Sequence, residues 1–209
     1  MILSLMLVKN ILEIIPSIII YAVLYLIVNK VQLFEATQVP KVSGDQLFEL
    51  SPAWLLIYFS SYVSIPISYL LIFYKIKKSF IRSFLSLTFL SFTIFMLYPT
   101  YVARVELDYT NMNIIYATLF EVLRGADSPT NCIPSLHVST AFLIFYLSIY
   151  LKHKTLIIST LIYAVLVSLS TLFVKQHLLL DVYTGFLAAS VVFGLNLLWE
   201  KNFGKKTVE

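Results

Sequence analysis

Six apolar segments separated by polar connections fill most of this 209-residue chain, and they constrain its fold more than any other feature. A helix that crosses the hydrocarbon core of a bilayer needs about 20 mostly apolar residues. The segments that meet this length or approach it are 11–28, 52–74, 80–98, 136–151, 155–173 and 180–199. Only 12% of the residues are charged, whereas water-soluble domains carry about 25%. We therefore predict an all-α, integral membrane six-helix bundle that forms a single domain over residues 1–209.

The basic residues are distributed unequally between the two sides of such a bundle. If the N-terminus is cytoplasmic and the spans alternate, ten Lys and Arg residues lie inside and five lie outside. The inside set is Lys9, Lys75, Lys77, Lys78, Arg82, Lys152, Lys154, Lys201, Lys205 and Lys206. The outside set is Lys30, Lys41, Arg104, Arg124 and Lys175. Because cytoplasmic loops are enriched in Lys and Arg, we predict a multi-pass protein of the cell membrane with both termini in the cytoplasm.

The longest connection, residues 99–134, lies outside the cytoplasm in this topology. Its apolar residues recur at helical spacing over about 112–124, which predicts an additional short helix. Long loops in compact proteins are usually functional. The connection near 174–179 falls on the same side, because the two connections follow the third and the fifth spans. Side chains from both connections can therefore meet at one extracytoplasmic face.

Two histidines and one carboxylate stand at the outer boundaries of apolar segments, at His137, His177 and Asp181. Ionisable residues at membrane spans are energetically unfavourable, and their default interpretation is functional. His177 and Asp181 have the i, i+4 spacing that places two side chains on one face of a helix. A carboxylate that binds one ring nitrogen fixes the tautomer and makes the other nitrogen a better nucleophile or base. His137 supplies a second group that can donate or accept a proton.

Three further residues on the same side suit a phosphate group. Arg104 and Lys175 are cations that can bind a phosphate dianion. Ser135 adds a hydroxyl group directly before the fourth apolar segment, where the helix N-terminus also favours an anion. These side chains together fit phosphoryl transfer through a covalent histidine intermediate. A metal site of two histidines and a carboxylate is the alternative, but the basic neighbours disfavour a bound cation.

At these positions the chain resembles the type-2 phosphatidic acid phosphatase superfamily. Residues 134–137, Pro-Ser-Leu-His, are similar to its second signature, PSGH. Ser170, His177 and Asp181 are similar to its third signature, SRxxxxxHxxxD. The resemblance covers nearly the whole chain, and the order and spacing of the motifs together make it fairly specific.

The resemblance implies a role for each candidate residue. His177 would be the nucleophile, Asp181 would orient it, and His137 would protonate the leaving oxygen. The phosphate would be held by Arg104, Ser135 and Lys175. No metal ion or other cofactor would be required.

The chain departs from the signatures in three places. Thr171 stands where the third signature has arginine, and Lys175 is the candidate for the missing charge. Leu136 replaces the glycine of the second signature. The first signature, KxxxxxxRP, is absent in that form, and Arg104 is the candidate for its arginine. The combination of Pro-Ser-Leu-His with Lys-Gln-His resembles the branch that includes the inositol phosphorylceramide synthases.

The leading functional prediction is an integral membrane lipid phosphatase that removes phosphate from a phospholipid or a polyprenyl (pyro)phosphate. The alternative is a phosphotransferase that moves a phospho-headgroup to a lipid or sugar alcohol. A remote third possibility is a proton-coupled transporter, which requires ionisable residues near the middle of several spans. The expected partners are the lipid phosphate substrate and membrane lipids. The lysine clusters are interpreted as topology and headgroup contacts rather than nucleic-acid sites.

Overall fold

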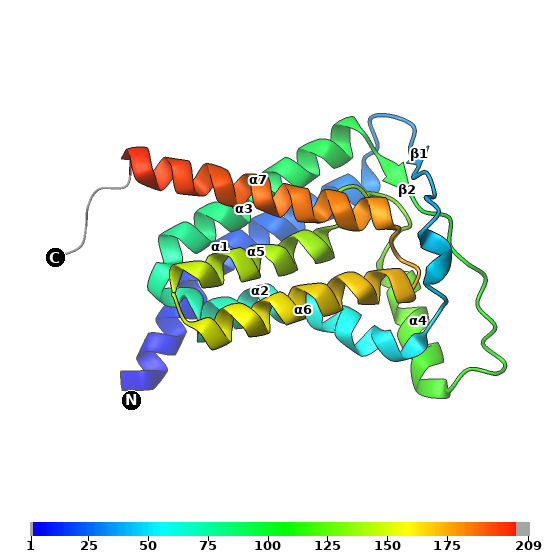
Figure 1. The fold of residues 1–209 in the computed structure, drawn as a ribbon, viewed down its shortest axis with the longest axis horizontal. Helices are drawn as coiled ribbons and strands as arrows, with labels where there is room; N and C mark the ends of the chain where they lie inside the picture. Colours follow the sequence, from blue (N-terminus) through cyan, green and yellow to red (C-terminus); the bar gives the residue numbers. More distant parts are fainter. Residues whose placement is uncertain (1, 204–209) are drawn as a thin grey trace.

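The computed structural model of the protein describes residues 2–203, which are mostly helical (Figure 1). The α-helices are α1 (Ile2–Lys30), α2 (Leu55–Leu71), α3 (Lys77–Leu97), α4 (Ile114–Ala126), α5 (Leu136–Tyr150), α6 (Lys154–Phe173) and α7 (Leu179–Phe203). The short 3-10 helices are η1 (Asp45–Leu47), η2 (Pro52–Trp54) and η3 (Phe73–Ile76). The short strands are β1 (Thr37–Gln38) and β2 (Thr100–Tyr101). The predicted all-helical class is confirmed.

Five helical segments of the described chain are long and apolar enough to cross a membrane. They are Val8–Lys30, Pro52–Leu71, Phe73–Leu97, Lys154–Phe173 and Leu179–Phe203. α5 is also apolar, but its 15 residues fall short of a full span. The length and composition of these helices indicate a membrane protein, whereas a sixth span through α5 stays a prediction.

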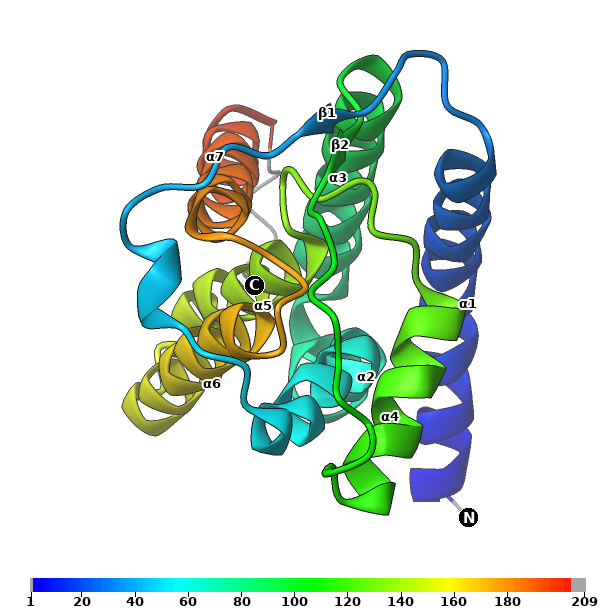
Figure 2. The ribbon, with the colours of Figure 1, turned by 90° about the vertical axis from the view of Figure 1, so that its right-hand side faces the viewer.

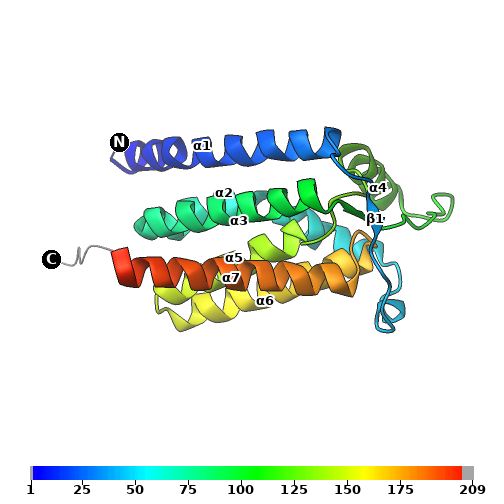
Figure 3. The ribbon, with the colours of Figure 1, turned by 90° about the horizontal axis from the view of Figure 1, so that it is seen from above.

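α5 occupies the centre of the bundle, with α2, α3, α6 and α7 around it (Figure 2). Ala141 of α5 packs with Ala164 and Val167 of α6, so that these two helices approach closely. On another side, Leu143 and Leu147 join a buried cluster with Phe80 of α3. Lipid tails are as apolar as leucine, so the hydrophobic effect does not drive membrane helices together. Close van der Waals packing of this kind does so instead. α1 lies apart from α6 and α7, on the far side of α2 and α3 (Figure 3).

The longer loops gather at one end of the bundle, beside β1, β2 and α4 (Figure 1). β1 pairs with β2 in parallel, which ties the connection after α1 to the connection after α3. α4 confirms the helix predicted within the long loop, and its N-terminus is capped by Asn113, whose side chain accepts a hydrogen bond from the backbone N–H of Ile115. The buried side chains Phe120 and Leu123 pack α4 against α2. The long loop is thus folded over the end of the bundle.

Candidate active site

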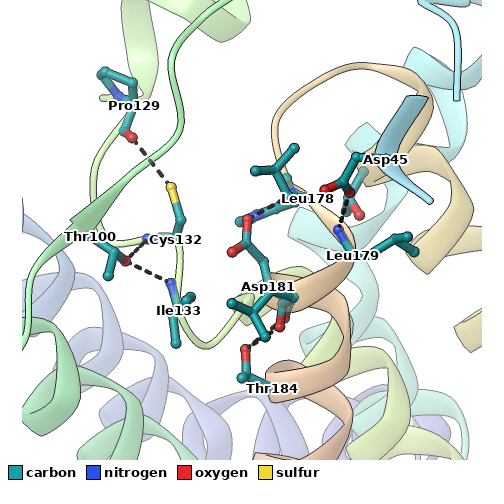
Figure 4. Close-up of polar contacts among 12 residues, drawn as sticks. Asp45, Thr100, Pro129, Cys132, Ile133, Leu178, Leu179, Asp181 and Thr184 are labelled. Carbon is teal, nitrogen blue, oxygen red and sulfur yellow. Dashed lines mark hydrogen bonds and ion pairs between the residues drawn. The ribbon is translucent and has the colours of Figure 1, made fainter. Parts of the chain in front are cut away.

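The first element of the site is the pair formed by His177 and Asp181. His177 lies in the connection between α6 and α7, and Asp181 lies in the first turn of α7. The Asp181 carboxylate, which is fully buried, is 3.1 Å from Nδ1 of His177. It also accepts a hydrogen bond of 2.9 Å from the backbone N–H of Leu178 (Figure 4). The contact with His177 directs Nδ1 toward the carboxylate and leaves Nε2 of His177 for other chemistry.

The connection before His177 is shaped by the end of α6. Lys175 has a φ of 58°, which reverses the chain after the last turn of the helix. The carbonyl oxygen of Thr171 accepts hydrogen bonds from the backbone N–H groups of Gln176 and His177. The Thr171 side chain is buried and donates to the carbonyl oxygen of Ser168. Thr171 therefore supports the backbone of His177, and its side chain is turned into the helix bundle.

His137 lies in the first turn of α5, beside His177. The centroids of the two imidazole rings are 5.8 Å apart. The His137 ring stacks on Tyr58, with centroids 4.4 Å apart, and meets Tyr62 edge to face. Two aromatic side chains of α2 thus fix the plane of the ring next to the His177–Asp181 pair.

The two sequence motifs are joined directly through the backbone. The N–H of Ser135 donates to the carbonyl oxygen of Asp181 over 3.2 Å. Gly185, one turn into α7, lies so close to α5 that a Cβ atom there would stand 2.8 Å from the carbonyl oxygen of Ser135 and 3.0 Å from Cβ of Val138. The absence of a side chain at Gly185 is therefore what allows the starts of α5 and α7 to touch.

Three polar side-chain atoms of the two sequence motifs are buried without a hydrogen-bond partner among residues 2–203. They are Oγ of Ser135, Nδ1 of His137 and Oδ1 of Asp181. A buried polar atom that lacks a partner costs about 1–3 kcal/mol, and such atoms are rare in folded proteins. Their concentration between the two motifs marks this place as one arranged for a polar ligand.

The two predicted phosphate-binding cations are held by backbone carbonyl groups. The Arg104 guanidinium donates to the carbonyl oxygens of Arg124, at 3.2 Å, and of Asp127. The Lys175 ammonium donates to the carbonyl oxygen of Phe48. Neither side chain lines the cavity described below, so the structure does not bring them into contact with the two histidines. Their role in phosphate binding stays a prediction.

A cavity of about 380 Å³ opens beside the two histidines. Its walls include apolar side chains of α1, α2 and α3, among them Ile18, Ile65 and Phe84. Leu136, which stands at the glycine position of the second signature, also lines it. The volume is in the usual range of about 300–1,000 Å³ for small-molecule sites. The cavity can accommodate an apolar group whose polar end faces the histidines.

Asp127 is the residue of this site that the sequence did not single out. It lines the cavity, and its carboxylate accepts a hydrogen bond of 2.5 Å from the hydroxyl group of Tyr25 in α1. Burial raises the pKa of Asp127, although Tyr25, His177 and Arg104 act to lower it. A carboxylate in a polar loop is usually solvated, so the partial burial of Asp127 was visible only in the structure. Its place shortly before the Pro-Ser-Leu-His segment was the available signal.

One group of side chains could provide metal ligands. The ligand atoms of Cys132, His177 and Asp181 all lie within 4.8 Å of one another. The Cys132 thiol donates to the carbonyl oxygen of Pro129 (Figure 4), and burial raises its pKa, which disfavours the thiolate that a metal binds. This group also leaves out His137 and so differs from the two-histidine metal site considered from the sequence. The donor set therefore fits a metal ion poorly.

Comparison with known proteins places these motifs in a family. The sequence profile of the PAP2 superfamily matches residues 48–195, which contain α2 to α6 and most of α7. The matched region includes both histidines and Asp181, whereas α1 and Tyr25 precede it. No curated protein and no solved structure gives a significant match to the chain.

Proposed function

Because the chain belongs to the PAP2 superfamily, which supports a phosphatase-type activity, we propose that it is an integral membrane lipid phosphatase with His177 as its nucleophile. The observation that carries this proposal is that His137 and His177 face one cavity, while Asp181 binds the far side of the His177 ring. A nucleophile, an orienting carboxylate and a proton donor are the parts that covalent phosphoryl transfer needs.

In the first step, Nε2 of His177 attacks phosphorus and the bond from phosphorus to the lipid oxygen breaks. His137 gives a proton to that oxygen, so that the lipid leaves as an alcohol. Asp181 stabilises the positive charge on the His177 ring. In the second step, water attacks the phosphohistidine, and the now neutral His137 accepts a proton from it. Neither step requires a metal ion.

The phosphate group would lie at the start of α5. Backbone N–H groups at a helix N-terminus bind anions, and the partnerless hydroxyl group of Ser135 is in this turn. Arg104 and Lys175 would turn from their carbonyl partners toward the phosphate once it is bound. Their backbone hydrogen bonds would then be exchanged for stronger charge-assisted ones.

The substrate class follows from the apolar walls of the cavity. Side chains of α1, α2 and α3 would surround the acyl or prenyl tail, while the phosphoester stays at the level of the headgroups. Phosphatidic acid and polyprenyl (pyro)phosphates have this form. The proposal treats residues 1–209 as one membrane-embedded domain with six spans, cytoplasmic termini and an extracytoplasmic site.

The second candidate is a phosphotransferase that passes the phospho-headgroup to a lipid or sugar alcohol. It is favoured by the likeness of Pro-Ser-Leu-His and Lys-Gln-His to the branch with the inositol phosphorylceramide synthases. Both candidates share the first step and differ in which hydroxyl group attacks the phosphohistidine.

The test is a phosphate-release assay on the purified full chain with phosphatidic acid and a prenyl pyrophosphate, in the presence of EDTA. We expect phosphate from at least one of them, and a loss of at least about 1,000-fold in His177→Ala, because the variant lacks the nucleophile. His153→Ala is the matched control, since His153 lies in the connection between α5 and α6 and caps α6. Full activity in His177→Ala would sink the assignment.

A further inference from the structure

The cavity beside the histidines has two unlike sides. Ile18, Ile65 and Phe84 make one side apolar. The other carries the loop residues from Asp127 to Asn131 together with Gln176. An apolar side suits a lipid tail, but a polar side in the same cavity holds water readily, because buried water needs about three polar partners.

Asp127 is the charged member of the polar side. The hydroxyl group of Tyr25 holds its carboxylate from α1, and the guanidinium of Arg104 holds its backbone carbonyl. Its carboxylate takes part in no ion pair within residues 2–203. It is nevertheless close enough to His177 for the two charges to interact. A carboxylate that is held by Tyr25, is not ion-paired and lines the same cavity as the nucleophile is a strong acceptor for a hydrogen bond from a ligand.

We propose that Asp127 orients the water molecule that hydrolyses the phosphohistidine at His177. This inference rests on the proposed function. It adds Asp127 to the site and a preference for water over an alcohol as the phosphoryl acceptor. Water has two O–H groups, so it can donate one hydrogen bond to His137 and the other to Asp127. An alcohol has a single hydroxyl hydrogen and can satisfy only one of them. The pair of acceptors therefore favours hydrolysis over transfer to an alcohol.

The atoms and protons of this step balance. The water oxygen forms a bond to phosphorus while the bond from phosphorus to Nε2 of His177 breaks. The electron pair of the broken bond returns to Nε2. His137, which gave its proton to the leaving alcohol, takes one proton from the water. The second hydrogen stays on the oxygen, which is now part of the phosphate, and remains hydrogen-bonded to Asp127. Burial raises the pKa of Asp127, which makes it a better acceptor than a solvated carboxylate.

The test separates the two half-reactions with ³²P-labelled phosphatidic acid as the substrate. Diacylglycerol release in the first turnover reports the attack by His177, and phosphate release reports hydrolysis. We expect Asp127→Asn to slow phosphate release about 10- to 100-fold while the first release of diacylglycerol changes less than about twofold. Labelled phosphohistidine should accumulate. With 1-butanol added, the ratio of butyl phosphate to phosphate should rise.

Two further variants complete the experiment. Asp108→Asn is the matched control, because Asp108 is an exposed carboxylate of the same long loop whose hydrogen bonds go to the nearby Thr110 and Asn111. Tyr25→Phe removes the hydroxyl group that holds Asp127 and should slow the same step several-fold, which is less than the effect of Asp127→Asn. Tyr25→Phe also carries the test if Asp127→Asn does not fold.

The outcomes distinguish the inference from the function on which it rests. If the wild-type protein is active and Asp127→Asn slows both half-reactions equally, or leaves the butanol ratio unchanged, the inference is wrong and the proposed function stands. For Tyr25→Phe the corresponding contradiction is an unchanged rate of phosphate release. If the wild-type protein releases no phosphate and forms no phosphohistidine, both are wrong.

Discussion

The two ends of the helix bundle treat their charged side chains in opposite ways. At the end away from the candidate site, carboxylates and cations pair with each other: Glu13 with Lys77 at 2.6 Å, and Arg82 with Glu200 at 2.7 Å. At the site end, the cations of Arg104 and Lys175 donate to backbone carbonyl groups instead. These two cations thus have no carboxylate partner among residues 2–203, whereas the Asp181 carboxylate contacts the His177 ring.

We interpret the paired charges as contributing to the fold and the charges at the site end as available to bind a ligand. Paired side chains near a surface contribute about 0–1 kcal/mol and have their charge already neutralised. At the site end, polar atoms of Ser135, His137 and Asp181 are buried without hydrogen-bond partners in the described part of the chain, which opposes folding. Partnerless polar groups and perturbed carboxyl groups cluster at functional sites, and the site end has both.

After loss of the nucleophile His177, the largest effect is expected at His137. Loss of a general acid lowers the rate by about 100- to 10,000-fold, so His137→Ala should lose this much activity on phosphatidic acid. An activated substrate such as p-nitrophenyl phosphate needs little protonation of its leaving group. With this substrate, the rate of the first half-reaction should therefore fall far less in His137→Ala. Burst kinetics with both substrates measure this ratio. An equal loss of the burst with both would show that His137 does not act as the acid.

The contact between α5 and α7 should be nearly as sensitive. In Gly185→Ala the new methyl group would stand 2.8 Å from the carbonyl oxygen of Ser135, so α5 must shift. A displacement near 1 Å lowers catalysis about 100-fold. Gly194→Ala lies on the same helix with no atom within 4 Å of the added Cβ, which makes it the matched control. Phosphate release by the two folded variants should differ widely, and equal rates would contradict the proposed geometry.

Replacing Asp127 with Asn should raise the stability of the protein although it lowers the rate of hydrolysis. Burial raises its pKa in the folded protein above the usual 3.8, so the folded state holds the proton more tightly than the unfolded state does. This contribution is present below that usual value and is lost as the pH rises through the raised pKa. Tyr25, Arg104 and His177 are the groups that face it. Asp127→Asn should therefore unfold at a higher temperature than the wild type at pH 8, in detergent.

That advantage should shrink as the pH is lowered, because the wild-type carboxyl group then becomes neutral as well. Thermal unfolding of both proteins across this pH range measures the difference directly. A wild-type protein that is more stable than Asp127→Asn at pH 8 would contradict the unfavourable burial of this charge.

The smallest effect is expected at the opposite end of the bundle. Lys77→Gln breaks the pair with Glu13, whose two side chains are 42% and 25% exposed. The free energy of unfolding should change by less than about 1 kcal/mol, since solvent screens the pair. Phosphate release should be unchanged. A large loss of activity in this variant would remove the distinction between the two ends.

Hydrophobicity and spacing predicted most of the architecture. Each of the six apolar segments lies in or along one of the helices α1, α2, α3, α5, α6 and α7, and the apolar rhythm in the long loop became α4. The contact between His177 and Asp181 was predictable because the i, i+4 spacing acts within one short stretch. Local periodicity carries this information without any knowledge of the tertiary structure.

The partners of the loop side chains were not predictable in the same way. Arg104 and Lys175 bind backbone carbonyl groups, and these leave no residue pattern in a sequence. Asp127 and Tyr25 are far apart in the chain, so their contact depends on how α1 meets the loop. The sequence also did not predict whether α5, with its 15 residues, crosses the whole bilayer. Composition alone does not determine how deep a helix lies in the bilayer.

The most direct test of the central claim is the detection of phosphohistidine at His177. The full chain would be mixed with ³²P-labelled phosphatidic acid, quenched within one turnover and analysed by peptide mass spectrometry under alkaline conditions, in which phosphohistidine persists. We predict label on His177 in the wild type, more label in Asp127→Asn and none in His177→Ala. Phosphate release by the wild type with no label on His177, or with the label on another residue, would contradict the account.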